Sequence, residues 1–336
     1  MTRDIDFLLT YLNPNDVAWQ AEKNRFSAGE TSDVNPNRYR EWDNLRYLFR
    51  SVERFAPWIR TFHVVTCGHL PDWLDASHPK IHVVRHADYL PAEWLPTFSS
   101  RCIDMNFHRI PDLAEHFVYF NDDMFLGRPV SPTDFFSPDG LPLATAILVP
   151  TQLRAVPGQA LHLAPVVNTA VVNAHFAMKR VIRQRPFNWL SPKYGRALFR
   201  SALLMSYDKF PGFRPVHLPY SYLKSTYATV WDEESGRCAS ASAHRFREIA
   251  DLNHWIFDFW QFASNRFRPR SLSAGRCFQL RTPRDAVAAA AAIRARRFKL
   301  LCLNDVVEDP ADFPGIAATV NNALAGLFPE KSSFEK

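Results

Sequence analysis

The stretch DNLRYLFRSVERFAPWIRTFHVVTC, residues 43–67, decides the fold that we predict for this chain. In its first half, large apolar residues recur every three or four positions, as on one buried helix face, and Pro57 ends the pattern. Its second half is a short apolar run rich in β-branched residues, which predicts a buried strand. A similar run, IDFLLTYL, lies at residues 5–12. Strand, helix and strand in this order form a crossover unit, so we expect a mainly parallel sheet with helices on its faces.

Other segments extend this alternation along the chain. Apolar runs predict further strands at residues 80–86, 116–122 and 298–305. The segment at residues 284–298 is rich in alanine and arginine, and this composition strongly favours a helix. Residues 329–336 are predicted to form a surface tail. Additional helices are predicted at residues 45–55, 100–109, 220–231, 253–263 and 320–328.

The middle of the chain differs from its two ends. Residues 131–213 are less periodic and are proline-rich at their edges, so we interpret them as an insertion or a subdomain that faces the substrate. We therefore predict an α/β, Rossmann-like fold with a mainly parallel sheet, flanking helices and an inserted, more helical region. Residues 1–130 and 214–336 would form the two halves of the α/β domain.

Composition and charge narrow the class of protein. Of the 336 residues, 47% are apolar and 14% are aromatic, which is typical of a globular protein with a sizeable core. The net charge of +6 suits an anionic ligand such as a nucleotide, or a membrane surface. The chain lacks the dense basic runs of a dedicated nucleic-acid binder, so we expect no nucleic acid among its partners.

Cysteine usage and the first residues bear on location. The five cysteines are odd in number and form no CxxC pair, which argues against a disulfide framework or a structural zinc site and favours a reducing compartment. The chain begins with acids and lacks a signal-peptide hydrophobic region, and no apolar run approaches the ~20 residues of a membrane span. We predict a soluble, intracellular protein.

Polar side chains follow two of the predicted strands. Asn121, Asp122 and Asp123 end one apolar run, and Asn304 and Asp305 end another. If both strands lie in one sheet with the same direction, their acids meet at the edge where open parallel sheets bind ligands. Clustered carboxylates repel one another, and a divalent cation such as Mg²⁺ or Mn²⁺, often shared with phosphates, removes that cost. The alternative is that one acid caps the following turn and the others are solvated.

Several long, ordered motifs resemble the Stealth phosphotransferases. This family includes bacterial capsular polysaccharide phosphotransferases and the catalytic subunit of the animal lysosomal-enzyme GlcNAc-1-phosphotransferase. The resemblance covers most of the chain, and residues 131–213 are its least diagnostic part. The motifs are IDFLLTYLNPNDVAW (5–19), the segments at 38–74 and 95–127, HLPYSYLKSTY (217–227), SAHRFRE (242–248), LCLND (301–305) and FPEKSSFEK (328–336).

The resemblance implies a reaction. A sugar-1-phosphate would pass from a UDP-sugar donor to a hydroxyl of an oligo- or polysaccharide acceptor with release of UMP, in the biosynthesis of capsule or exopolysaccharide. The phosphorus, rather than the anomeric carbon, would be attacked, and Mg²⁺ or Mn²⁺ would be the cofactor. Two alternatives stay open: a metal-dependent glycosyltransferase that forms a plain glycosidic bond, and a non-catalytic protein that binds a glycan or a nucleotide.

The resemblance also implies roles for single residues. Asp305 matches the family's metal-binding acid, His217 its catalytic histidine and Arg247 its essential arginine. An acid just before the first predicted helix is also expected in the catalytic site. Many relatives have Asp where Glu41 stands here, and Asp43 follows two residues later, so both remain candidates.

The chemistry of phosphoryl transfer suggests what these residues would do. Asp305, with Asp122 or Asp123, would hold the metal against the diphosphate. His217 would take the acceptor proton as a general base, or attack phosphorus and form a phosphohistidine. Arg247 would clamp the transferred phosphate, although an arginine judged without the motif is more often part of a surface ion pair.

Other polar residues near these motifs are candidates for substrate binding, each with a simpler alternative. Asn13 and Asp16 follow the first strand and would lie near a nucleotide, or merely form a turn. Arg46 would bind phosphate or pair with a nearby acid, and Lys224 would bind phosphate or remain solvated. The predicted substrate-binding residues are Asn13, Asp16, Arg46, Asn121, Lys224 and Asn304.

The short chain carries no appended lectin-like or transmembrane module, which favours a bacterial cytoplasmic enzyme that acts near the inner membrane face. A peripheral contact with that membrane, or with a polysaccharide assembly complex, stays open.

Overall fold

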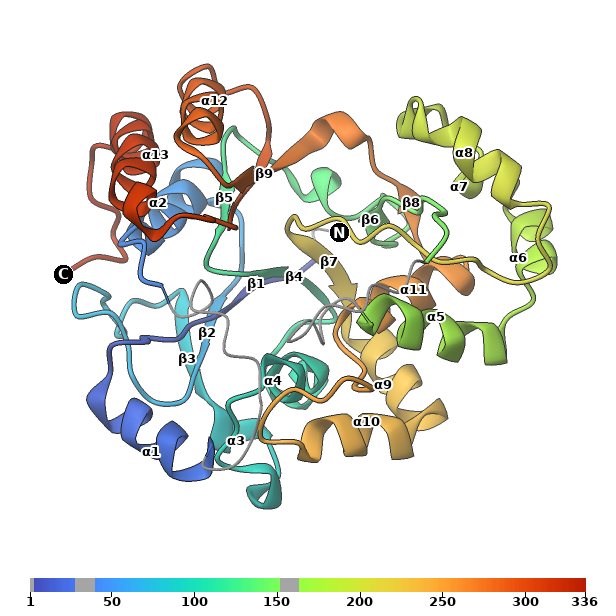
Figure 1. The fold of residues 1–336 in the computed structure, drawn as a ribbon, viewed down its shortest axis with the longest axis horizontal. Helices are drawn as coiled ribbons and strands as arrows, with labels where there is room; N and C mark the ends of the chain where they lie inside the picture. The colour runs from blue at the N-terminus through green and yellow to red at the C-terminus, as the bar shows by residue number, and fades with distance from the viewer. Residues whose placement is uncertain (1–2, 28–39, 152–162) are drawn as a thin grey trace.

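A five-stranded sheet forms the centre of the molecule in the computed structural model, which describes residues 3–27, 40–151 and 163–336. The strand order is β3-β2-β1-β4-β7, the first four strands run parallel, and β7 runs antiparallel to β4. The predicted α/β class with a mainly parallel sheet is therefore confirmed (Figure 1). These strands are β1 (Ile5–Thr10), β2 (Phe62–Thr66), β3 (Ile81–Arg85), β4 (His116–Phe120) and β7 (Tyr220–Leu223).

Helix α2 (Leu45–Phe55) makes the predicted crossover from β1 to β2. Its apolar face is buried against the sheet, and the ring centroids of Phe49 and Phe62 lie 4.8 Å apart. Helix α1 (Val17–Ser27) precedes it. Helix α2 ends at Phe55, two residues before Pro57, because proline cannot continue the hydrogen-bond ladder.

A second, three-stranded sheet holds the C-terminal acidic strand. Its order is β5-β10-β9, with β5 (Met124–Leu126) antiparallel and β9 (Gly275–Leu280) parallel to β10 (Leu300–Asp305). The condition that both acidic strands share one sheet is not met, since β10 pairs with β5 and β9 while β1 and β7 occupy the two edges of β4.

The two acidic segments meet nevertheless. The turn that contains Asp123 leads from β4 directly into β5, and the backbone N–H of Leu303 donates to the Asp123 carbonyl at 2.8 Å. Gly127 permits the close approach of β5 to β10, since a Cβ at this position would lie 2.6 Å from the Phe298 carbonyl oxygen. The turn after β4 is thus shared between the two sheets.

Residues 220–231 differ from the prediction of a single helix. They form β7 and then helix α9 (Lys224–Glu233). The four residues of β7 are all buried and pair with β4 along the edge of the sheet, where aromatic residues are favoured. Tertiary pairing therefore overrides the local helical pattern.

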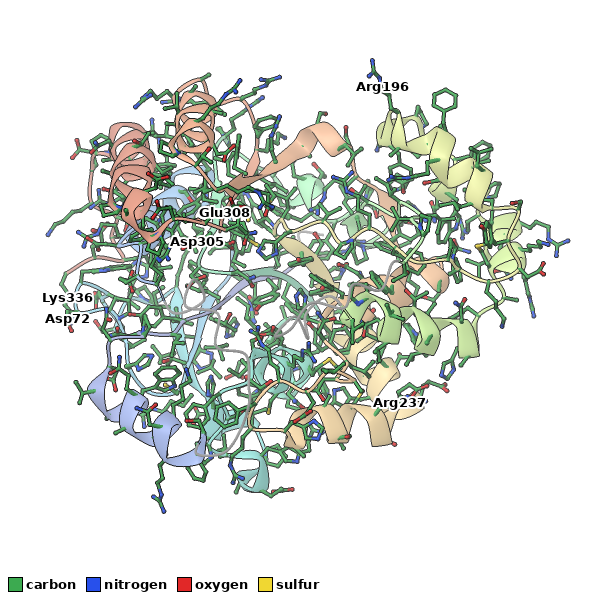
Figure 2. All side chains as sticks on the ribbon, viewed as in Figure 1. Asp72, Arg196, Arg237, Asp305, Glu308 and Lys336 are labelled. Carbon is green, nitrogen blue, oxygen red and sulfur yellow. The ribbon has the colours of Figure 1, made fainter. Side chains whose placement is uncertain are left out.

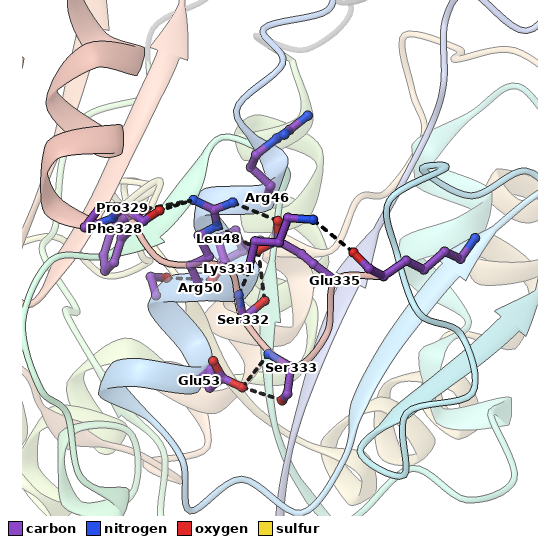
Figure 3. Close-up of polar contacts among 12 residues, drawn as sticks. Arg46, Leu48, Arg50, Glu53, Phe328, Pro329, Lys331, Ser332, Ser333 and Glu335 are labelled. Atoms are coloured by element: carbon purple, nitrogen blue, oxygen red, sulfur yellow. Dashed lines mark hydrogen bonds and ion pairs between the residues drawn. The ribbon is translucent and has the colours of Figure 1, made fainter.

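The C-terminal segment at 329–336 is packed, not the predicted surface tail. Phe334 is buried against Phe49, with ring centroids 5.9 Å apart. Arg50 of α2 grips both carboxylate oxygens of Glu335, at 2.7 and 2.8 Å, and Glu53 accepts from Ser333 (Figure 3). One aromatic anchor and a bidentate ion pair thus hold this segment on α2.

The remaining helices mostly agree with the sequence. The pattern at 100–109 forms α4 (Ser100–Met105) followed by a short 3-10 turn (Phe107–Arg109). Helices α12 and α13 pack together beside the second sheet (Figure 1). The other helices of these two parts are α3 (His86–Tyr89), α10 (Ser235–Ala243), α11 (Trp255–Ala263), α12 (Pro283–Arg294) and α13 (Phe313–Leu327).

The described part of residues 131–213 is mainly helical. Helices α6, α7 and α8 form one end of the molecule, away from the central sheet (Figure 1). A short parallel pair joins β6 (Leu143–Ala144) to β8 (Arg268–Pro269). The division at residues 130 and 213 stays a prediction. The helices of this region are α5 (Ala164–His175), α6 (Met178–Gln184), α7 (Pro186–Trp189) and α8 (Ala197–Leu204).

Among the helices of the described ranges, none combines the length and the hydropathy that a membrane crossing requires.

Candidate active site

An aspartate and a histidine pair at the carboxyl end of β4. Asp123 lies in the turn after β4, where the Met124 N–H donates to the Asn121 carbonyl at 3.1 Å. His217 lies three residues before β7, which pairs with β4, so the sheet brings the two segments together. The Nε2 atom of His217 lies 3.1 Å from Oδ2 of Asp123. Residues far apart in sequence therefore form one charged pair.

Each partner changes the protonation of the other. Burial would lower the pKa of His217, but the charge and hydrogen bond of Asp123 raise it to about 9. Burial would raise the pKa of Asp123, but His217 holds it below its usual range. At neutral pH the pair is therefore an imidazolium and a carboxylate.

The second ring nitrogen of His217 is also engaged. Its Nδ1 atom lies 3.2 Å from the hydroxyl of Tyr220, and the indole N–H of Trp255 donates to that hydroxyl at 3.1 Å. Burial raises the pKa of Tyr220 well above 10, so this hydroxyl stays protonated. The ring of His217 is consequently fixed from both sides.

Two cysteines border the pair. The Cys302 thiol donates to Oδ2 of Asp123 at 3.2 Å and lies 3.3 Å from the sulfur of Cys277, its register partner in β9. Burial raises the pKa of Cys302 well above its usual value, so the thiol remains a hydrogen-bond donor. Oδ2 of Asp123 thus has two partners.

Asp122 lies beside this pair and in the field of another acid. Burial and the negative charges of Asp123 and Glu41 raise the pKa of Asp122 to about 7. The side chain of Asp122 is exposed to solvent, so a ligand could approach its carboxylate. The pKa of Tyr11, the residue after β1, is raised mainly by burial and also by the negative charge of Glu41. Glu41 therefore faces the carboxyl end of the sheet.

Asp43, the other candidate before α2, is turned to the surface. Its side chain is 79% exposed and its carboxylate lies 3.3 Å from Arg46. The backbone at Asp43 has φ 49°, and its N–H donates to Oε1 of Glu41, an exposed side chain, at 2.9 Å. The structure thus brings Glu41, but neither Asp43 nor Arg46, toward Asp122.

Asp305 is held by a different set of groups. Arg40 lies 3.3 Å from its carboxylate, the indole N–H of Trp42 donates to Oδ2 at 3.1 Å, and the Val307 N–H donates to Oδ1 at 3.0 Å. Because side chains alternate along a strand, Asp305 lies on the face of β10 opposite Cys302, on the side of α13, where Figure 2 labels it. The segment that holds Asp305 also carries Glu41 to Asp122.

Asn304, the residue before Asp305, pairs with the neighbouring strand instead. Its amide donates to Oε1 of Gln279 at 2.7 Å. The alternation along β10 places Asn304 on the same face as Cys302.

Arg247 approaches the site from the segment after α10. It donates to the hydroxyl of Ser100 at 2.7 Å. Burial, with the charges of His217 and Arg247, lowers the pKa of His254 to about 3. The ring of His254 lies 4.7 Å from that of Tyr220, the partner of His217. Arg247 and His217 therefore both lie near His254.

The polar residues after β1 form a local turn. The Asn13 N–H donates to Nε2 of His69 at 2.7 Å, and its side-chain oxygen accepts from Asn15. Asp16 accepts from the Trp19 N–H at 2.7 Å, inside the first turn of α1. These residues follow Tyr11, so they lie at the same end of the sheet as Asp122.

Lys224 lies at the other end of the sheet. Its ammonium donates to the carbonyls of Ile110, Pro111 and Leu113, at 2.9, 3.3 and 3.3 Å. The residue before it, Leu223, pairs with the first residue of β4. The structure therefore does not bring Lys224 and His217 together, since β7 runs antiparallel to β4 and carries Lys224 to the opposite end of the sheet.

The oxygens near the pair suit a hard divalent cation. Within the described ranges, no group donates a hydrogen bond to Oδ1 of Asp123 or to Oδ1 of Asn121, although both atoms are buried. A buried oxygen without a donor is costly, and the repulsion at Asp122 adds to that cost. Ligand atoms of Asp123, His217 and Cys302 also lie within 4.8 Å of one another, although a protonated thiol is a poor ligand. A possible Asp/His/Cys metal site is thus present.

Three contacts of the pair were missed by the sequence reasoning. Cys302, Tyr220 and Trp255 were not singled out from the sequence. A signal existed for Cys302, because it precedes Asn304 by two positions in a strand and so shares its face. No local signal marks Trp255, which reaches Tyr220 only through the tertiary packing of α11 on β7.

Comparison with known proteins adds independent findings. Models of the Stealth protein family match residues 38–144, as conserved region 2, and residues 291–336, as conserved region 4. The chain is 36% identical to "Capsular polysaccharide phosphotransferase WcwK" of Streptococcus pneumoniae, over 99% of this chain and 98% of that protein. It is 36% identical to "Receptor polysaccharide phosphotransferase WefC" of Streptococcus gordonii over the full length of both. It is 32% identical to "Exopolysaccharide phosphotransferase cps2G" of Lactiplantibacillus plantarum, over 99% of this chain and 96% of that protein.

Proposed function

The chain belongs to the Stealth family and is a phosphotransferase, and we propose that it transfers a sugar-1-phosphate from a UDP-sugar to a hydroxyl of a glycan acceptor, with release of UMP. The names of its relatives support an acceptor from surface polysaccharide, such as a growing capsule or exopolysaccharide chain. The sugar and the linkage are left to experiment.

One observation carries the proposal: the Asp123–His217 pair lies beside Asp122, whose pKa is about 7, with an oxygen of Asp123 left free. A purely structural pair needs no free oxygen and no second acid. A site that binds a diphosphate and its cation needs both.

The proposed step forms one bond and breaks one bond. The acceptor oxygen attacks the β-phosphorus, and the bond from that phosphorus to the bridging oxygen breaks. The electron pair of that bond leaves with UMP, and the hydroxyl proton goes to a base. The product is a phosphodiester between two sugars.

We assign the base role to His217 in its neutral form. Asp123 orients the ring through Nε2, and Tyr220 contacts the other nitrogen. The acceptor hydroxyl would displace one of these contacts, because geometry in the free enzyme often tightens only when substrate binds. Since the pKa of His217 is about 9, the neutral ring is the minor form at pH 7. A phosphohistidine would instead require Nδ1 or Nε2 to lose its partner and face phosphorus.

The chain's own oxygens would hold Mg²⁺ or Mn²⁺. Asp122 and Asp123 are the proposed ligands, and Asn121 offers a further buried oxygen. Asp305 would join them only if its carboxylate exchanged Arg40 and Trp42 for the cation. When bound, such a cation would neutralise charge on the diphosphate and on the leaving phosphate.

The remaining residues would position the two substrates. Arg247 would exchange its bond to Ser100 for a phosphate oxygen. Glu41, rather than Asp43, is the proposed active-site acid of its segment. Asn13 and Asp16 lie where the nucleotide of an open α/β sheet binds, beyond the ends of the strands. A cytoplasmic location stays a prediction.

The test is to incubate the purified protein with a panel of UDP-sugars, an oligosaccharide acceptor and Mg²⁺. We expect UMP, together with a ³¹P NMR signal of a new phosphodiester, and no product from the Asp123→Asn variant. Release of UDP with a phosphorus-free product would identify a glycosyltransferase. Binding of UDP-sugar without turnover would identify a binding protein.

A further inference from the structure

The positive charge of the chain is concentrated in one segment. Residues 176–209 contain eight Lys and Arg residues against one Asp, a net charge of +7. The other residues then hold 32 Lys and Arg against 33 Asp and Glu, a net charge of −1. The net charge of +6 therefore belongs to this segment alone. All eight basic residues are exposed, namely Lys179, Arg180, Arg183, Arg185, Lys193, Arg196, Arg200 and Lys209.

The same segment exposes apolar side chains. Of the eight large apolar residues that are exposed among the described ones, five lie within positions 187–207. They are Phe187, Leu190, Phe199, Leu203 and Tyr207, with exposed fractions of 85%, 43%, 76%, 77% and 57%. Single exposed apolar residues are ordinary, but a group of them marks an interaction site.

Helix α8 shows how the two kinds of side chain are combined. Arg196, Phe199, Arg200, Leu203 and Tyr207 recur every three or four positions, so they share one side of the helix and its end. The opposite side holds Ser201 and Leu204, which are buried. The outward stripe of α8 is thus built of arginines and large apolar residues.

This stripe lies where a large flat partner could reach it. Helices α6, α7 and α8 form the end of the molecule farthest from α13 (Figure 1). Figure 2 shows Arg196 directed outward from the tip of α8. We name the exposed side chains of residues 179–209 on these helices the basic–apolar surface.

We propose that the basic–apolar surface docks on a phospholipid bilayer that contains anionic headgroups. Arginine and lysine side chains bind such headgroups, and phenylalanine and leucine gain free energy only if they enter the acyl region. A soluble polyanion, such as a nucleic acid or an acidic glycan, would use the charges but leave the apolar side chains in water. The proposal is independent of the reaction at Asp123 and His217, which lie in a different part of the fold.

The test is co-sedimentation of the full chain with vesicles. We expect binding to phosphatidylcholine vesicles that contain phosphatidylglycerol, weak binding to phosphatidylcholine alone, and release at high ionic strength. The double variant Arg200→Gln/Leu203→Ser should bind about tenfold more weakly, because it loses one charge and one apolar anchor.

A matched control is available on α12. Arg284→Gln/Val287→Ser changes an exposed arginine and an exposed apolar residue at the same spacing, outside the basic–apolar surface, where Val287 is 60% exposed. This variant should bind vesicles as the unchanged chain does. Every substituted side chain is exposed, so both variants should fold like the unchanged chain. Thermal melting of all three proteins checks this.

Three results would overturn the proposal. The first is equal binding by the two double variants. The second is a loss of binding with Arg200→Gln but not with Leu203→Ser, which would show a polyanion site without apolar insertion. The third is a dimer in analytical ultracentrifugation that Arg200→Gln/Leu203→Ser dissociates, with no sedimentation on vesicles, which would show that the surface joins two copies of the chain.

Discussion

Two Asp–His pairs stand at opposite ends of the central sheet. At the amino end, Oδ2 of Asp6 in β1 lies 3.0 Å from Nε2 of His63 in β2. At the carboxyl end, Oδ2 of Asp123 lies 3.1 Å from Nε2 of His217. The same two residue types, at nearly the same distance, therefore occur in two environments of one molecule.

The environments differ in what happens to the other carboxylate oxygen. Oδ1 of Asp6 accepts from Arg60 at 2.8 Å, and Oδ2 accepts from Arg60 and from the Ala114 N–H as well. Asp6 is fully buried and completely satisfied. Oδ1 of Asp123 has no donor among the described residues, and a second acid adjoins it. An unsatisfied oxygen next to a like charge, rather than the pair itself, distinguishes the candidate site.

The largest effect should come from removing the charge at the carboxyl end. Asp123→Asn and His217→Ala should each lower the rate of UMP release by about 10³-fold or more, because proton transfer and charge stabilisation are both lost. The midpoint of thermal unfolding should also fall, because the pair that raises the pKa of His217 stabilises the folded state at neutral pH, although the fall is limited by the partial exposure of the pair. Near-normal turnover in either variant would remove that residue from the mechanism.

The second largest effect is expected from removal of the metal, which should affect the carboxyl end of the sheet but not the amino end. EDTA should stop UMP release, and Mg²⁺ or Mn²⁺ should restore it. Added Mg²⁺ should also raise the melting temperature of the unchanged protein, because a ligand that binds only the folded state stabilises it. The shift should persist in Asp6→Asn and vanish in Asp123→Asn. Full activity after thorough chelation would exclude a metal from the reaction.

The amino-end pair should matter for stability instead. Asp6→Asn should lower the free energy of unfolding by about 3 kcal/mol, because it removes the buried charge that Arg60, His63 and the Ala114 N–H share. Turnover per folded molecule should stay unchanged. Urea unfolding, combined with UMP release under native conditions, measures both quantities.

The pH dependence of that loss provides the control. Burial would raise the pKa of Asp6, but hydrogen bonds from Arg60 and His63 hold it below its usual value in the folded state. The stability that Asp6 contributes is therefore present above the unfolded pKa of about 3.9 and is lost as the pH falls through the lower folded value. The difference between the two proteins should shrink in that acid range. A constant difference would show that the charge of Asp6 is not responsible.

The rate itself should follow the protonation of His217. A general base works only when neutral, and the pKa of about 9 means that the neutral fraction rises about fifty-fold from pH 7 to pH 9. The value of kcat/KM should rise in that range and level off above it. A fall over the same range would indicate that the imidazolium is the active form.

NMR titration of His217 checks the origin of this value. In Asp123→Asn the pKa of the ring should return toward about 6.5, since the charge that raises it is gone.

The smallest effect is expected at Lys224. Lys224→Met removes an ammonium that binds three backbone carbonyls at the amino end, and it should lower the free energy of unfolding by about 1 kcal/mol. Turnover should be unaffected. A tenfold loss of kcat/KM would place Lys224 in substrate binding after all.

How far the sequence predicts the fold depends on how local each feature is. The helix at 45–55 and the strands around it follow from apolar spacing within a few residues, and the structure contains them. The sheet that β10 joins could not be read from the sequence, because β10 pairs with β5 and β9, which lie far from it along the chain or beyond local patterns. The packed C-terminal segment was missed because Phe334 finds its partner Phe49 far away in sequence.

The candidate site divides in the same way. Asp122, Asp123 and His217 come from motifs in which the chain order already suggests chemistry, and the structure brings them together. The choice between Glu41 and Asp43 could not be made from sequence, because both side chains are exposed and only the folded chain shows that the charge of Glu41 acts on Asp122 and Tyr11. The partners of Asp305, Arg40 and Trp42, could not be predicted either, since they depend on how β10 packs beside α13.

The turn after β4 has a mechanical consequence. Asp123 lies in the segment that joins β4 of the central sheet to β5 of the smaller sheet. Its position relative to His217 therefore depends on how β5 pairs with β10. Gly127 allows the two backbones to approach, because it has no side chain at this close contact. A methyl group at position 127 would push β5 and β10 apart and so displace the carboxylate of Asp123 relative to His217. A Gly127→Ala variant would then lose turnover, although residue 127 is not part of the candidate site.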